Sequence, residues 1–156
     1  MMKPSLKSGG NSVEMVAFQI GHREFCVDIA LVREIKGWMP TTTIPHAPHY
    51  ILGVVNLRGL VLPVVDLAAR LGFPATVPTK RHVIVVVDVE GQVFGLLVDA
   101  VSDIFSVTPE MMSVAPEISG EMARSFISAV VSIGDRMIAR VVPERMLPER
   151  AKGQAA

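Results

Sequence analysis

The chain is built from short apolar runs, four to seven residues long and rich in valine and isoleucine, separated by glycine, proline and charged residues. Such runs indicate β-strands rather than amphipathic helices, because β-branched side chains suit a pleated surface. Two hairpins are predicted, one around Gly21-His22-Arg23 and one around Glu90-Gly91. The pattern therefore predicts an all-β fold with a few short helices.

The remaining elements follow from the same criteria. Proline cannot donate to a strand ladder, so the proline-rich stretches 40–48 and 74–78 are predicted connections. Asp66 and Asp99 each follow an apolar run and are expected to cap the turn that comes next. We expect further strands at 54–57, 60–65, 104–107, 126–133 and 136–142, and short helical turns at 30–35, 67–71 and 116–122.

The sequence also repeats itself. Residues 25–35 align with residues 94–104 at an offset of 69, and the preceding hairpin strands align as well. The stretch GVVNLRGLVLPVV from Gly53 resembles AVVSIGDRMIARVV from Ala129 when a small gap is allowed. We therefore expect two β units of about 70 residues each, closed into barrels or sandwiches that leave no exposed sheet edge.

Charge and composition exclude several classes of function. Fifteen basic residues balance fifteen acidic ones, which argues against nucleic acid as the main ligand. A single cysteine, Cys26, excludes an internal disulfide and fits a reducing cytoplasm. No apolar run approaches the ~20 residues of a membrane span, so no direct membrane insertion is expected. Residues 1–12 and 149–156 are predicted flexible tails around a domain at 13–148.

No catalytic motif is present. The chain lacks a phosphate-binding glycine loop and a Gly-x-Ser-x-Gly elbow. Cys26 is interpreted as a core thiol, and the His46–His49 stretch as a surface loop rather than a metal site. We therefore expect no catalytic residue, cofactor or metal. A small enzyme or a ligand-binding barrel remains the alternative, which would need Asp66, Asp88 and a histidine around one polar cavity.

Arg58 is the residue that most needs an explanation. It lies with Gly59 between two apolar runs, and a guanidinium is costly to bury without a partner. It must reach water, pair with a carboxylate or meet another protein; Glu34, Asp88 and Asp103 are the candidate partners within the chain. An arginine rimmed by leucine and valine is also favoured at interfaces.

These motifs resemble those of the CheW-like coupling proteins of bacterial chemotaxis. The resemblance covers about residues 14–147, and its pieces occur in the order of the family. They are FQIG (18–21), FCVDI (25–29), VREI (32–35), IPHAP (44–48), YILGVVNLRG (50–59), LPVVDL (62–67), the valine run 83–87, GLLVDAVSDI (95–104) and GDRM (134–137).

The resemblance implies two five-stranded, SH3-like β-barrels packed on a shared hydrophobic seam. It also implies a non-enzymatic adaptor, in the cytoplasm, that is recruited to membrane-associated receptor arrays. The adaptor would couple the cytoplasmic tip of methyl-accepting chemotaxis receptors to the regulatory domain of a CheA-like histidine kinase. The contact residues that carry over by motif are Val32, Glu34, Ile35, Gly53, Asn56, Arg58, Gly59 and Val83.

The chain departs from the family pattern at its last strand. Arg140 interrupts the apolar run, and Pro143 ends the strand early, so the terminal helix is expected to be short or absent. Asp66 in LPVVDL favours a stand-alone adaptor over the related kinase domain. An adaptor of another chemosensory pathway, serving twitching motility, biofilm formation or development, remains an alternative.

Overall fold

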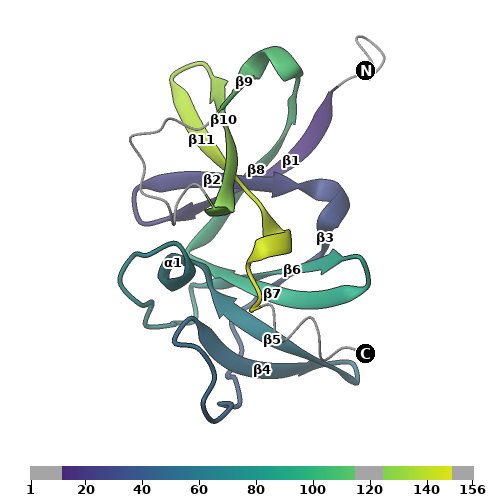
Figure 1. Cartoon of the computed structure of the whole chain (residues 1–156), viewed down its shortest axis with the longest axis vertical. Helices are drawn as coiled ribbons and strands as arrows, with labels where there is room; N and C mark the ends of the chain where they lie inside the picture. The colour runs from purple at the N-terminus through teal and green to yellow at the C-terminus, as the bar shows by residue number, and fades with distance from the viewer. Residues whose placement is uncertain (1–11, 115–124, 149–156) are drawn as a thin grey trace.

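The computed structural model describes residues 12–114 and 125–148 and consists mainly of β-strands in two sheets (Figure 1). One sheet has the strand order β8-β1-β2-β11-β10-β9, and the other has the order β3-β6-β7-β5-β4. The predicted all-β class is confirmed; the first sheet holds a sixth strand, β9, of only two residues. The helical turn expected at 116–122 lies outside the described residues.

The bounds of the elements match most of the predicted strands. The first sheet contains β1 (Val13–Ile20), β2 (Arg23–Asp28), β8 (Ala100–Val107), β9 (Met112–Ser113), β10 (Ile127–Ile133) and β11 (Arg136–Val141). The second contains β3 (Val32–Gly37), β4 (Ile51–Leu57), β5 (Leu60–Asp66), β6 (Val83–Val89) and β7 (Gln92–Val98). The helical pieces are α1 (Leu67–Arg70) and the 3₁₀ turns η1 (Ile29–Leu31), η2 (Pro109–Met111) and η3 (Pro143–Arg145).

The internal repeat is present in the strand register. Met15 lies opposite Asp28 in the β1–β2 pair, and Ile84 lies opposite Leu97 in the β6–β7 pair, which preserves the offset of 69. The β4–β5 and β10–β11 hairpins also correspond residue by residue, and each carries an irregularity at the same place. The gap allowed in the sequence alignment is therefore not needed.

The two halves of the sequence repeat do not coincide with the two barrels of the structure. β3 follows β2 in the chain but pairs with β6, while β8 follows β7 but pairs with β1. Each sheet therefore combines strands of both repeats: the β1–β2 hairpin of the first repeat lies in the sheet of β8, β10 and β11, and the β6–β7 hairpin of the second repeat lies in the sheet of β3, β4 and β5. This exchange corrects the expectation of two self-contained β units, because neither repeat completes a sheet with its own strands.

One predicted helix is wrong. Residues 30–35 were expected to form a helical turn, but only Ile29–Leu31 is helical, and β3 begins at Val32. Side chains along β3 alternate between half-buried and exposed, which is the two-residue period of a strand. Pairing with β6 thus outweighs the local preference that Ala30 and Leu31 give for a helix.

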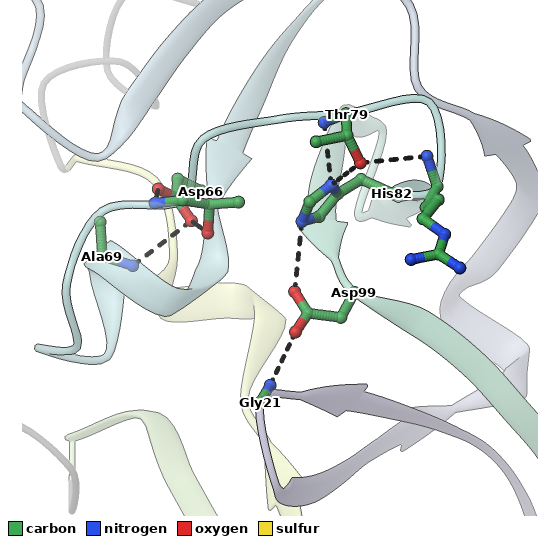
Figure 2. Close-up of polar contacts among 8 residues, drawn as sticks. Gly21, Asp66, Ala69, Thr79, His82 and Asp99 are labelled. Carbon is green, nitrogen blue, oxygen red and sulfur yellow. Dashed lines mark hydrogen bonds and ion pairs between the residues drawn. The ribbon is translucent and has the colours of Figure 1, made fainter.

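The two aspartates predicted to be caps behave differently (Figure 2). Asp66 is buried and caps α1: its carboxylate accepts the Ala69 N–H, and it also accepts the N–H and hydroxyl of Thr76 at 2.7 and 2.8 Å. The cap predicted at Asp99 is wrong, because β8 begins at the next residue and leaves no turn to cap. Asp99 instead accepts the Gly21 N–H at 2.7 Å and faces His82.

The hydrophobic core confirms the shared seam between the barrels. Its largest cluster takes residues from both sheets, among them Phe18 and Val27 from the first and Val85 and Phe94 from the second. Smaller clusters fill the interior of each barrel. Removal of these side chains from water is the main favourable contribution to folding, so the two barrels stabilise each other through the seam.

Gly53 is required by a close backbone approach. It adopts a φ of +145°, and a Cβ atom at this position would overlap the carbonyl oxygen of Thr42. Thr42 and Val54 exchange backbone hydrogen bonds of 2.9 and 2.8 Å, which cover the outer edge of β4. Only glycine permits this approach without displacing the 40–48 connection.

We predict that Gly53→Ala lowers the free energy of unfolding by about 2 kcal/mol or more, because the change combines a strained φ with an atomic overlap. The matched control is Gly37→Ala, where a Cβ meets open space and φ is not positive. That variant should stay within about 1 kcal/mol of wild type. Urea unfolding of both variants measures the difference, and equal losses would contradict the role given to Gly53.

Candidate functional site

The turn between β4 and β5 presents Arg58 to solvent. Arg58 and Gly59 both have positive φ, +52° and +88°, as a two-residue hairpin turn requires. The Asn56 side chain accepts the Gly59 N–H at 2.8 Å and braces the turn. A non-glycine residue is uncommon in this backbone region, which Glu90 also adopts in the β6–β7 turn.

Arg58 pairs with Glu34 of β3. Its Nη2 donates to the Glu34 carboxylate, which confirms one of the three candidate partners. β3 is one edge of the five-stranded sheet, and β4 with its turn is the other edge, so the ion pair closes the barrel. The Arg58 side chain is nevertheless 68 % exposed, against 25 % for Glu34. The guanidinium therefore keeps donor groups accessible to a second partner.

A small depression lies beside this ion pair. Its volume is about 140 Å³, and its lining combines charged and apolar side chains: Arg33, Glu34, Leu57, Arg58, Leu60, Leu62, Val86 and Val93. Leu60, which lines it, and Ile35 and Val61, which do not, are exposed hydrophobic residues of β5 and β3. We call the exposed side chains of Ile35, Arg58, Leu60 and Val61, together with the partly exposed Glu34, the Arg58 surface.

The residues predicted from the sequence fall into three groups. Glu34, Ile35 and Arg58 belong to the Arg58 surface, and Asn56 and Gly59 shape its turn. Gly53 is buried beneath Thr42. Val32 and Val83 are half-buried and pack against the shared core. The geometry thus brings four of the eight together, Glu34, Asn56, Arg58 and Gly59, while Ile35 follows Glu34 in β3. A contact of any of them with a partner stays a prediction.

The other two candidate partners of Arg58 are engaged elsewhere. Asp88 lies 3.8 Å from Arg33, and Asp103 pairs with Arg136 at 3.1 Å. Arg136 also contacts Glu24 at 2.8 Å. The hydrogen bonds that Arg136 donates, first to Glu24 and then to Asp103, raise the pKa of its guanidinium above the ordinary value.

The Arg136 cluster is a second closing contact that the sequence reasoning missed. Asp103 occupies the position in β8 that Glu34 occupies in β3, at the offset of 69. Ile104 likewise matches Ile35, and both are exposed. The alignment of the two repeats could have predicted this contact, since each barrel carries an acidic residue at the same position of its edge strand.

The described residues do not assemble the alternative enzymatic site. The carboxylate of Asp66 already accepts hydrogen bonds from Ala69 of α1 and from Thr76. Asp88 accepts the Gly91 N–H and lies near Arg33. Among residues 12–114 and 125–148, no group of three or more His, Cys, Asp or Glu side chains could hold a metal ion. In the same ranges, no helix has the length and apolarity to span a membrane.

Cys26 lies in the interior of the first barrel, fully buried beside Met15 and Ile138. Burial raises the pKa of its thiol to about 12, and nearby Arg140 only partly offsets this effect. The interpretation of Cys26 as a core residue agrees with this environment, because a nucleophilic cysteine needs an accessible thiolate.

We predict that Cys26 resists iodoacetamide in the native protein at pH 8, because its thiol is buried and stays protonated. Unfolding in guanidinium should allow complete labelling. The unfolded chain ionises near pH 9 and the folded chain near pH 12, so this group makes stability fall as pH rises through that window. Rapid native labelling at pH 8, followed by mass spectrometry, would contradict the burial.

Comparison with known proteins gives one consistent result. Residues 14–151 match the family model described as the CheW-like domain. The chain is 54 % identical over 136 residues to a probable chemotaxis protein CheW of Rhizobium etli, covering 87 % of this chain and 88 % of that protein. It is 50 % identical over 150 residues to the chemotaxis protein CheW of Rhizobium meliloti, covering 96 % of each.

A solved structure shares the fold. The crystal structure of the scaffolding protein TtCheW from Thermoanaerobacter tengcongensis is similar with a TM-score of 0.77 and 29 % sequence identity. The similarity covers 83 % of this chain and 88 % of that one.

Proposed function

Because the chain belongs to the CheW-like domain family, we propose that it is an adaptor of bacterial chemotaxis that works by holding other signalling proteins together. Two relatives that match most of its length are named as chemotaxis CheW proteins. The similar solved structure is described as a scaffolding protein. This function is favoured over an adaptor of twitching motility, biofilm formation or development.

The Arg58 surface is the observation that carries the proposal at residue level. It combines an exposed, only partly engaged guanidinium with exposed aliphatic side chains, the composition of an interface anchor. Its depression of about 140 Å³ is small for a metabolite site, since ligand pockets usually measure about 300 Å³ or more. A protein partner therefore fits this surface better than a substrate does.

The proposed partners are the cytoplasmic tip of a methyl-accepting chemotaxis receptor and the regulatory domain of a CheA-like histidine kinase. An α-helical receptor tip can place apolar side chains against Ile35, Leu60 and Val61. A carboxylate or carbonyl of that tip would accept from the free nitrogens of Arg58. Glu34 acts as a positioning residue, because its carboxylate fixes the direction of the Arg58 side chain. The adaptor would thus act in the cytoplasm, without catalysis.

We predict that Arg58→Ala weakens binding to a receptor cytoplasmic fragment about tenfold or more, because the variant loses a charge-assisted anchor. Isothermal titration calorimetry with the purified full-length chain measures the change. Lys80→Ala is the matched control, since it removes an exposed cation from the 67–82 connection rather than from the Arg58 surface. Wild-type affinity of Arg58→Ala for both receptor fragment and kinase domain would contradict the role of Arg58.

We further predict that Glu34→Gln weakens binding less than Arg58→Ala does, and that the double variant is no weaker than Arg58→Ala alone. The reason is that Glu34 acts through Arg58, so its effect should vanish when Arg58 is absent. Additive losses in the same titrations would show that Glu34 contacts the partner independently. A pull-down with each fragment separately tests the adaptor itself: binding to neither fragment would overturn the proposed function.

A further inference from the structure

The two barrels are joined by the chain at two places within residues 12–114 and 125–148. The chain passes from β2 through η1 to β3, and from β7 through Asp99 to β8. Two junctions define a line, and rotation of one barrel about that line is not restrained by the covalent chain. The shared core packs the two barrels together, but the burial of apolar area that stabilises it is not itself directional. A directional contact outside the junctions would fix the angle more tightly.

Arg70, the last residue of α1, makes such a contact. α1 follows β5 of the second sheet, whereas η3 follows β11 of the first. The Arg70 Nε donates to the carbonyl oxygen of Met146 at 2.8 Å, and its Nη2 donates to that of Arg145 at 3.1 Å. These carbonyls belong to the end of η3, so the guanidinium bonds directly across the boundary between the barrels.

The same guanidinium is stacked between two aromatic rings. Its central carbon lies 3.9 Å from the ring centroid of Tyr50 and 4.6 Å from that of Phe126. Tyr50 precedes β4 in the second sheet, and Phe126 precedes β10 in the first. Both rings are almost fully buried. Cation–π contacts in such desolvated surroundings are stronger than those at exposed sites.

Tyr50 and Phe126 are equivalent positions of the internal repeat. The Tyr50 carbonyl accepts the Asp66 N–H at 2.7 Å, and the Phe126 carbonyl accepts the Val142 N–H at 2.8 Å. The helical turns that follow, α1 and η3, are also equivalent. Arg70 therefore lies where the two repeats meet, and it contacts matching elements of both. The residue of the second repeat that corresponds to Arg70 is Met146, directly after η3. Only one of the two repeats therefore supplies an arginine at this place.

The geometry points to Arg70 as the clamp that fixes the relative orientation of the two barrels, through a planar guanidinium held by two carbonyls and two rings. A lysine cannot reproduce this arrangement, since an ammonium is not planar and cannot donate in a fixed fork. The inference concerns the free protein and does not depend on the proposed adaptor function.

The test measures the angle between the barrels directly. Nitroxide labels are attached to Val61→Cys on β5 and Met137→Cys on β11, two exposed positions in different barrels; Cys26 is fully buried and stays in place. Double electron–electron resonance of the full chain should give one narrow distance distribution. We expect Arg70→Gln and Arg70→Lys to broaden it or add a second distance.

Hydrogen exchange provides a second readout. The amides of η3 and the start of β10 should exchange about tenfold faster or more in both Arg70 variants, because loss of the clamp permits local opening. The matched control is Arg33→Gln, which removes an arginine whose ion pair with Asp88 lies within the second sheet. Arg33→Gln should match the unchanged protein in both measurements.

Three outcomes would overturn the clamp. The first is an unchanged distance distribution in Arg70→Gln. The second is wild-type behaviour of Arg70→Lys, which would show that positive charge alone suffices. The third is equal broadening in Arg33→Gln, which would reflect general loss of stability. Arg70→Lys keeps the charge and most of the alkyl stem, so it decides the question if Arg70→Gln fails to fold.

Discussion

The exchange of the β1–β2 and β6–β7 hairpins between the two repeats is the constraint on which the rest of the structure depends. Each sheet needs strands supplied by both repeats, so the repeats cannot separate without breaking the backbone ladders β1–β8 and β3–β6. The exchange also forces the two sheets to share one apolar cluster, which contains the largest buried side chains of both. The structure is therefore one cooperative unit, although its strands form two barrels.

The two barrels are closed by similar ion pairs, which differ in how much of the arginine side chain remains exposed. An acidic residue on an edge strand, Glu34 on β3 of one barrel and Asp103 on β8 of the other, meets an arginine near a hairpin turn. Arg136 is held by two carboxylates, whereas Arg58 is held by one and is largely exposed. Duplication thus supplied two closing contacts, and only the one at Arg58 leaves much of a guanidinium available to another protein.

Much of this architecture could be predicted from the sequence, because strands and turns depend on neighbouring residues. The valine-rich runs identified the hairpins, and the position of Asp66 before Leu67 predicted its role as a cap. The errors occurred where contacts distant in the sequence decided the local structure. Ala30 and Leu31 favour a helix, but β6 extends the next residues into a strand; Asp99 resembles a cap, but no turn follows it.

The sequence by itself determined the strand content, the repeat, the family and the fact that Arg58 needs a partner. Only the tertiary structure selected Glu34, which is 24 residues away, over Asp88 and Asp103. It alone revealed that Gly53 permits the approach of Thr42, and that Arg70 joins the barrels. The physical reason is one of range: propensity and turn chemistry act over a few residues, whereas pairing across a closed barrel depends on how all of its strands are arranged.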